Sequence, residues 1–225
     1  SVDAHRQLAA LYVDLGRFSQ AESIFLQTFG WMRSRLDRNH PDLARAYNSL
    51  AIVAWERGDI DRALGFQRQA VAAWKTGHND GLTANGLFNM AMILHSVGRD
   101  REALPAVRES RDLRIQQFGA THELVGDSDR LLGEVLAAQG DTEAARTALA
   151  NAVRLTRAGY GEVHSHTRRA EVSLARFEAA QGDPAALQRL RGMASYEGRD
   201  IEQRKASWLA RAYAAEMECR TRPDS

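Results

Sequence analysis

Five glycines recur at a nearly constant spacing along the chain, and they constrain its fold more than any other feature. They lie in the segments VDLGRF, WERGDI, HSVGRD, AAQGDT and AAQGDP, at Gly16, Gly58, Gly98, Gly140 and Gly182. The successive intervals are 42, 40, 42 and 42 residues. A fixed period of this length is the sequence signature of a repeat architecture.

Positions around these glycines keep the same register and predict pairs of helices. Eight residues before each glycine stands a large apolar residue, and the next residue is small: Ala9, Ala51, Ala91, Gly133 and Ala175. Small residues return five and twelve residues after most of the glycines, as at Ala21, Ala63, Ala103, Ala145, Ala70, Ser110 and Ala152. A glycine in the left-handed conformation ends the first helix, and the small residues let the second helix pack closely against it. Each repeat is therefore predicted to be a helix, a tight turn and a helix.

The whole chain is predicted to be all-α. It has only four prolines, and alanine, leucine, arginine and glutamate recur with helical spacing. Asp59, Asp141 and Asp183 follow turn glycines and are expected to cap the next helices, with Pro184 at a first helical position. No composition break or linker divides residues 1–225, so we expect a single domain of about five helix pairs.

The fifth repeat is degraded, and the end of the chain departs from the pattern. Leu187 stands where a small residue is expected, and RGMASYEGRDIEQ interrupts the register. We expect a last helix at about residues 200–219, in which Trp208, Leu209 and Tyr213 cover the otherwise exposed apolar face of the final repeat.

The leucine and small-residue pair before the glycine, with alanines after it, resembles the tetratricopeptide repeat, whose standard period is about 34 residues. The longer period resembles the kinesin-light-chain variant, in which a His-Pro pair precedes the first helix of a repeat. NHPDLA has the full pair, THELVG and VHSHTR keep the histidine without the proline, and GHNDGL of the shorter third repeat lacks the pair. The resemblance covers essentially the whole chain, and it implies a right-handed α-solenoid whose first helices line a concave, partner-binding face.

The histidines of these segments are predicted to be joints between repeats rather than metal ligands. His40, His122 and His164 occupy equivalent places in different repeats, so they lie too far apart to share one ion. Pro41 presets the entry to a helix. His164 and His166 are close enough to touch one ion, but no second cluster joins them. We predict no metal and no cofactor.

Sequence motifs of known enzyme classes are incomplete or absent. THELVG begins like a zinc-protease helix, but Gly126 stands where the second histidine is required, and no phosphate-binding or nucleophile motif occurs. Asp127 and Asp129 are expected on a solvated helix face, and Trp31 and Trp74 between neighbouring repeats. The chain is therefore predicted not to be an enzyme.

Charge and cysteine content limit the partners. Thirty basic and 29 acidic residues give a net charge of +1, which argues against nucleic-acid binding. No run of 18 apolar residues predicts a membrane span. The single cysteine, Cys219, fits a reducing, cytoplasmic environment, although the chain has no start methionine and reads as a fragment.

The resemblance places the exposed stripe of each first helix at thirteen, ten, six and three residues before the turn glycine. The partner-binding residues predicted at these positions are Arg6, Arg45, Asn48, Ile52, Trp55, Asn85, Phe88, Met92, His95, Arg130 and Glu134. Apolar anchors beside amide and guanidinium donors suit an extended peptide. The alternative is that Trp55, Phe88 and Met92 simply pack between adjacent first helices.

Two functions follow, with enzymatic activity a distant third. The first is a noncatalytic scaffold that binds a peptide or partner protein on its concave face. The second is a regulatory domain that senses a peptide or ligand and controls an attached kinase or DNA-binding domain. The segments HTRRAEVSLARFEAAQGD and WLARAYAAE resemble C-terminal regions of bacterial serine/threonine kinases, which suggests a larger bacterial signalling protein. A homodimer is also open.

Overall fold

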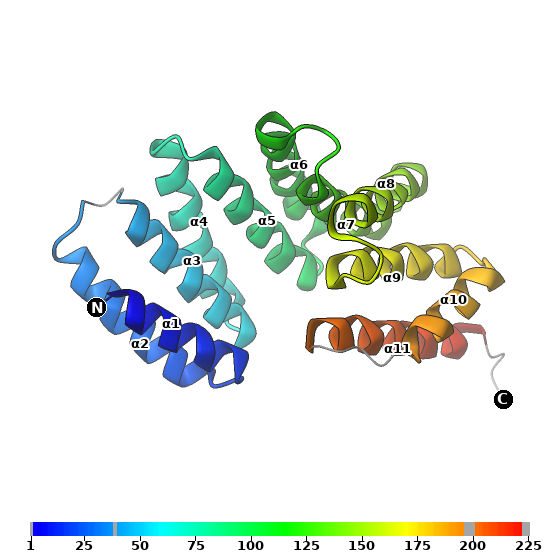
Figure 1. Cartoon of the computed structure of the whole chain (residues 1–225), viewed down its shortest axis with the longest axis horizontal. Coiled ribbons are helices and arrows are strands. Elements are labelled where there is room, and N and C mark those ends of the chain that lie inside the picture. The colour runs from blue at the N-terminus through cyan, green and yellow to red at the C-terminus, as the bar shows by residue number, and fades with distance from the viewer. Residues whose placement is uncertain (1, 38–39, 196–200, 222–225) are drawn as a thin grey trace. The chain divides into compact units, whose positions relative to one another are not determined.

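The computed structural model describes residues 2–37, 40–195 and 201–221, and every regular element in these ranges is an α-helix. In chain order the helices are α1 (Val2–Asp14), α2 (Phe18–Arg33), α3 (Pro41–Glu56), α4 (Ile60–Thr76), α5 (Asp80–Ser96), α6 (Asp100–Phe118), α7 (Glu123–Ala138), α8 (Thr142–Tyr160), α9 (Ser165–Ala180), α10 (Pro184–Ala194) and α11 (Ile201–Thr221). Successive helices fold back on each other as pairs (Figure 1). The all-α helix-pair prediction is confirmed.

The chain divides into two compact units, residues 1–113 and 114–225. The first unit holds α1 to α5 and most of α6, and the second holds the end of α6 and α7 to α11. One continuous solenoid domain over both units stays a prediction.

The repeat glycines end the first helix of each pair, as predicted. All five have a positive φ, between 69° at Gly16 and 91° at Gly182, which is the backbone region that favours glycine. At Gly58 the next residue, Asp59, donates its backbone N–H to the carbonyl of Ala54 at 2.9 Å and closes the turn. The side chains of Asp59, Asp141 and Asp183 then cap α4, α8 and α10, so the predicted caps are confirmed.

Small residues let the two helices of a pair approach closely. A Cβ atom at Gly133 on α7 would lie 2.6 Å from Cγ of Leu149 on α8, which is far inside normal contact. The alanines predicted at these crossings are completely buried, as at Ala9, Ala21, Ala51, Ala63, Ala91, Ala103 and Ala145. Close packing of helix pairs therefore builds the core of both units.

The repeat histidines cap helices, which is the structural role predicted for them. His40, His122 and His164 precede α3, α7 and α9, and their Nδ1 atoms accept backbone N–H groups two residues later at 3.2, 3.2 and 3.3 Å. Pro41 lies at the start of α3. In the shorter third repeat Asn79 replaces the histidine, because its side-chain oxygen accepts the N–H of Leu82 at 3.1 Å and caps α5.

A last helix closes the second unit, but with a different face from the one predicted. α11 packs on α9 and α10, and Ala210 and Ala214 lie in one cluster with Val172, Ala175 and Leu190. Trp208 is 57% exposed and Leu209 36% exposed, so their assignment to the covering face was wrong, while Tyr213 is correctly placed. The covered face of α11 is therefore formed by small alanines rather than by the large apolar residues. Residue 200, the predicted start, lies outside the described residues.

The two tryptophans predicted to pack between repeats differ from each other. Trp74 is 3% exposed and lies against Gly86 of α5, where a Cβ atom would come within 2.7 Å of its ring. Trp31 is 49% exposed, so its prediction was wrong, and the Arg35 guanidinium lies over its ring instead.

None of the helices in the described ranges combines the length and the apolar character that a membrane span requires.

Candidate functional site

In the first unit, the predicted partner-binding residues lie at the surface of α1, α3 and α5. We call this set the first-helix stripe: Arg6, Arg45, Asn48, Ile52, Trp55, Asn85, Phe88, Met92 and His95. Arg6, Arg45 and Asn85 are exposed, and the other six are partly exposed. The predicted register therefore selects side chains that are at least partly exposed, and their role in partner binding stays a prediction.

An amide cluster joins α3 to α5 within the stripe. Oδ1 of Asn48 accepts from Nδ2 of Asn89 at 3.0 Å and from Nε2 of Gln67 at 3.1 Å. Gln67 is completely buried and also donates to the carbonyl of Gly86 at 3.1 Å. Because its oxygen is held in this way, Asn48 keeps a fixed orientation and presents its NH2 group as a donor.

Two stripe residues at the turn end of the helices are anchored by neighbours. Nε1 of Trp55 donates to Oγ of Ser96 at 3.1 Å, which is a second link between α3 and α5. Nδ1 of His95 bonds the Asp100 carboxylate at the start of α6. Trp55 therefore both packs between first helices and stays partly exposed, so the two interpretations of its role are compatible.

A pocket of about 350 Å3 in the first unit includes part of the stripe. Arg6 and Arg45 line it, together with the exposed Trp31 of α2. Trp31 was predicted to pack between neighbouring repeats, so its place in this pocket was missed. No signal in the repeat pattern distinguishes Trp31 from Trp74, because the two occupy similar positions near the ends of second helices.

The remaining predicted residues lie in the second unit and bind each other. Nη1 of Arg130 contacts both carboxylate oxygens of Glu134 at 2.8 Å, and Oγ of Ser173 on α9 donates to the same carboxylate. Burial lowers the pKa of Arg130, but Glu134 together with Asp127 and Tyr213 outweighs this effect, so that the net shift is upward. The charge of Arg130 is thus neutralised within the fold.

A buried polar network surrounds Asp127, contrary to the solvated face predicted for it. Asp127 is 6% exposed and Asp129 is 1% exposed. Oη of Tyr160 donates to Oδ2 of Asp127 at 2.8 Å, and Nδ1 of His166 bonds Oδ1 at 2.7 Å. The carboxylate is therefore satisfied inside the protein, which is the condition for burying it.

The buried charge of Asp127 affects the pKa values of Arg114 and Tyr160. Nη1 of Arg114 donates to the carbonyl of Leu124 and to Oγ of Ser128, both at 2.9 Å. Burial lowers the pKa of Arg114, and the Asp127 carboxylate opposes this shift. Burial, and next the Asp127 charge, raise the pKa of the Tyr160 hydroxyl, so it stays protonated as a donor. The acidic, basic and hydroxyl groups of this network therefore complement one another, and we assign the network a structural role.

The histidine pair near this network has other partners. His166 is held by Asp127, and Nδ1 of His164 accepts a backbone N–H, while the ring of His164 stacks on Tyr160 at 4.7 Å. Within the described ranges, no group of three or more histidine, cysteine or acidic side chains is arranged to hold a metal ion.

Comparison with protein-family models identifies the repeats. The model named Tetratricopeptide repeat matches residues 2–76 and 82–158. The chain belongs to the tetratricopeptide repeat family. A comparison with curated protein sequences found no match.

Solved structures share the tetratricopeptide repeat fold at low sequence identity. A putative kinesin light chain with nearly identical TPR-like repeats, from Podosopora anserina, is 16% identical with a TM-score of 0.69, and the match covers 99% of this chain and 97% of that one. BtubC (BKLC) from P. vanneervenii is 18% identical with a TM-score of 0.70, covering 100% and 83%. A Rap protein complexed with Competence and Sporulation Factor is 14% identical with a TM-score of 0.70, covering 95% and 56%. The kinesin-light-chain-like repeat predicted from the histidine segments is confirmed at the level of the fold.

Proposed function

We propose that this tetratricopeptide repeat chain is a noncatalytic protein-interaction module that binds a peptide segment of its partner on the first-helix stripe. The observation that carries the proposal is the mixture within the stripe: partly exposed apolar side chains beside an oriented amide and exposed guanidinium groups, on three helices of one unit.

Each kind of side chain in the stripe matches one part of a peptide. The NH2 group of Asn48 is oriented by Asn89 and Gln67 and suits a backbone carbonyl of the ligand. Ile52, Phe88 and Met92 are apolar and only partly exposed, so they offer contact area to an anchor side chain.

Arginines at the edge of the stripe complete the match. Half of the Arg45 side chain is exposed, and its Nη1 atom lies 4.0 Å from Oδ1 of Asp42. A surface ion pair at this long separation contributes little to stability. A carboxylate of the ligand can therefore recruit its guanidinium group. Arg130 and Glu134 stay a prediction, and their mutual ion pair is the reason why the proposal gives more weight to the first unit.

The biological setting is part of the proposal. We infer a larger bacterial signalling protein, on the resemblance of HTRRAEVSLARFEAAQGD and WLARAYAAE to kinase-associated regions. In this setting the repeats form one solenoid domain in the cytoplasm, as a monomer or a homodimer, and recruit a protein partner to the attached domain.

A second candidate is a sensor that changes conformation when a peptide binds. It is favoured by the fold shared with the Rap protein that was solved with Competence and Sporulation Factor, although this chain spans only 56% of that one. Small-angle scattering with and without a bound peptide separates the two. An unchanged profile supports the scaffold, and a changed radius of gyration supports the sensor.

The test is to select peptides with this chain from a displayed library of random 12-residue sequences and to measure their affinities by calorimetry. We expect Trp55→Ala with Phe88→Ala to weaken binding about tenfold or more, since two anchors are lost. Trp208→Ala is the matched control, because Trp208 is an exposed tryptophan of α11, which belongs to the other unit. Circular dichroism confirms that the variants are folded. Equal affinities for the wild type and the double variant would refute the assigned surface.

A further inference from the structure

The first unit contains a larger pocket, which is lined mainly by the second helices α2 and α4 and lies outside the first-helix stripe. Its volume is about 710 Å3, within the range of pockets that hold small ligands or parts of peptides. Its lining residues come from α2, α3 and α4. None of the stripe residues lines it.

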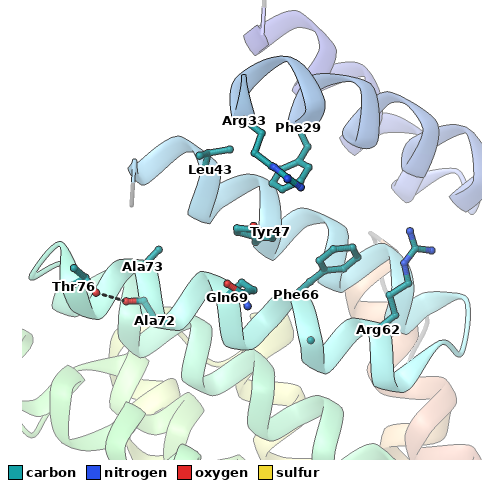
Figure 2. A pocket seen from close by; sticks show the side chains of 11 residues that line it. Phe29, Arg33, Leu43, Tyr47, Arg62, Phe66, Gln69, Ala72, Ala73 and Thr76 are labelled. Carbon is teal, nitrogen blue, oxygen red and sulfur yellow. Dashed lines mark hydrogen bonds between the residues drawn. The ribbon is translucent and has the colours of Figure 1, made fainter. Parts of the chain in front are cut away.

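The walls of the pocket are aromatic. Figure 2 shows Phe29 on α2, Tyr47 on α3 and Phe66 on α4, so each of the three helices that line the pocket contributes one ring. The ring centroids of Phe29 and Tyr47 are 4.8 Å apart, and those of Tyr47 and Phe66 are 6.2 Å apart. All three rings are partly exposed. An apolar ligand side chain would therefore replace water over three adjacent rings, which is a favourable exchange.

The charged side chains of the pocket are both cationic. Arg33 and Arg62 line it, and no acidic residue does. Arg62 is already paired with Glu22, at 2.6 Å. Among the described residues, Arg33 has no hydrogen-bond or ion-pair partner, and its side chain projects over the pocket from the last turn of α2 (Figure 2). One guanidinium group is thus available to a carboxylate.

Two neutral polar groups extend this complementarity. The Tyr47 hydroxyl and the exposed Gln69 amide also lack hydrogen-bond partners within the described part of the chain, and both line the pocket. The hydroxyl suits the same carboxylate, and the amide suits the peptide group that precedes it. A terminal amino acid residue carries the carboxylate, the side chain and that peptide group together.

We propose that this pocket is a second binding site, which takes the C-terminus of a partner protein whose last residue is aromatic or large and aliphatic. The side chain packs against Phe29, Tyr47 and Phe66, the carboxylate binds Arg33, and Gln69 holds the last peptide group. Because the pocket and the stripe have no lining residue in common, we expect the two sites to bind independently.

Gly65 offers a direct way to fill the site. It lines the pocket on α4, and a Cβ atom there would meet nothing within 4 Å. Gly65→Leu therefore occupies the pocket without disturbing the core, and it replaces a glycine inside a helix. Gly30→Leu is the matched control, since Gly30 lies within α2, also has open space, and lines neither described pocket.

The experiment uses fluorescence anisotropy with the dye-labelled tetrapeptide Gly-Ser-Gly-Phe as the free acid and as the C-terminal amide, with 3-phenylpropionate as a competitor. We expect the free acid to bind, and the amide to bind about tenfold more weakly, because it lacks the charge that Arg33 recognises. Gly65→Leu and Arg33→Gln should each weaken binding of the free acid about tenfold, while Gly30→Leu and the Trp55→Ala, Phe88→Ala pair retain it.

Several results would overturn the proposal. One is the absence of binding of the free acid at about 1 mM, the weakest affinity expected of a specific site. Others are equal binding of acid and amide, or an unchanged affinity in Gly65→Leu. Displacement of the peptide by 3-phenylpropionate at equal concentration would show a small-acid pocket instead of a C-terminus site.

Discussion

The two units of the chain use polar side chains on their first helices in opposite ways. In the first unit, the amide cluster on α3 and α5 orients Asn48 and leaves its NH2 group as a donor. In the second, Asp127 and Glu134 on α7 accept from neighbours within the fold, namely Tyr160, His166, Arg130 and Ser173. The first helices therefore leave a hydrogen-bond donor for a ligand in the first unit. In the second unit, carboxylates on a first helix bind the donors of neighbouring side chains within the fold.

The difference arises from charge. A buried carboxylate must be neutralised and fully hydrogen-bonded, so it recruits side chains from the next helices. An amide needs less compensation and can share its donors with a ligand. Hence we expect the second unit to contribute stability through its polar groups and the first to contribute recognition.

The largest effect is expected at Asp127. Asp127→Ala leaves the Tyr160 hydroxyl and the His166 ring without their acceptor, and it should lower the free energy of unfolding by about 3 kcal/mol. Asn48→Ala in the first unit should cost only about 1 kcal/mol, since the neutral donors of Asn89 and Gln67 lose one oxygen. Urea denaturation of both variants measures the contrast. An equal loss of unfolding free energy in the two variants would contradict the difference between the units.

We expect the close packing of helix pairs to contribute equally to the stability of the two units. A Cβ atom at Gly86 in the first unit would lie 2.7 Å from the Trp74 ring, and one at Gly133 in the second would lie 2.6 Å from Leu149. Gly86→Ala and Gly133→Ala should each destabilise by about 2 kcal/mol, because the neighbouring side chains must shift. Thermal unfolding checks this pair, and a large effect at only one site would show that packing also differs between the units.

The smallest effect is a pH dependence confined to the second unit. The pKa of Tyr160 is raised in the folded state by burial and by Asp127, so the folded protein retains this proton more strongly than the unfolded chain. The contribution is present below the unfolded pKa of about 10 and is lost as the pH rises above it. Tyr160→Phe should therefore flatten the fall in stability between about pH 9 and 11, as urea titrations at several pH values can show. An unchanged slope in Tyr160→Phe would mean that the hydroxyl is not coupled to folding.

The repeat architecture was predictable because its determinants are local and periodic. A glycine such as Gly58 ends a helix by its own backbone conformation, and a capping residue such as His40 acts on an N–H two residues away. Small residues at helix crossings, such as Ala51, leave an equally direct trace in the sequence. The spacing of the stripe also selected surface positions correctly in the first unit.

The details that the sequence did not predict depend on which long-range neighbour a side chain meets. Asp127 seemed to lie on a solvated face because its partners are 33 and 39 residues away. Asn89 lies 41 residues from Asn48 and falls between the positions of the expected stripe. Trp31 and Trp74 have similar sequence contexts, but only Trp74 faces a glycine, Gly86, that makes room for its ring.

Hydrogen exchange of the whole chain, with and without a library-selected peptide, tests the central claim most directly. We expect the peptide to slow exchange of backbone amides in residues 41–56 and 80–96, which form α3 and α5, and to leave exchange in residues 123–138 of α7 unchanged. Slowed exchange in residues 123–138 alone would contradict it, because recognition would then lie in the unit whose polar groups bind one another.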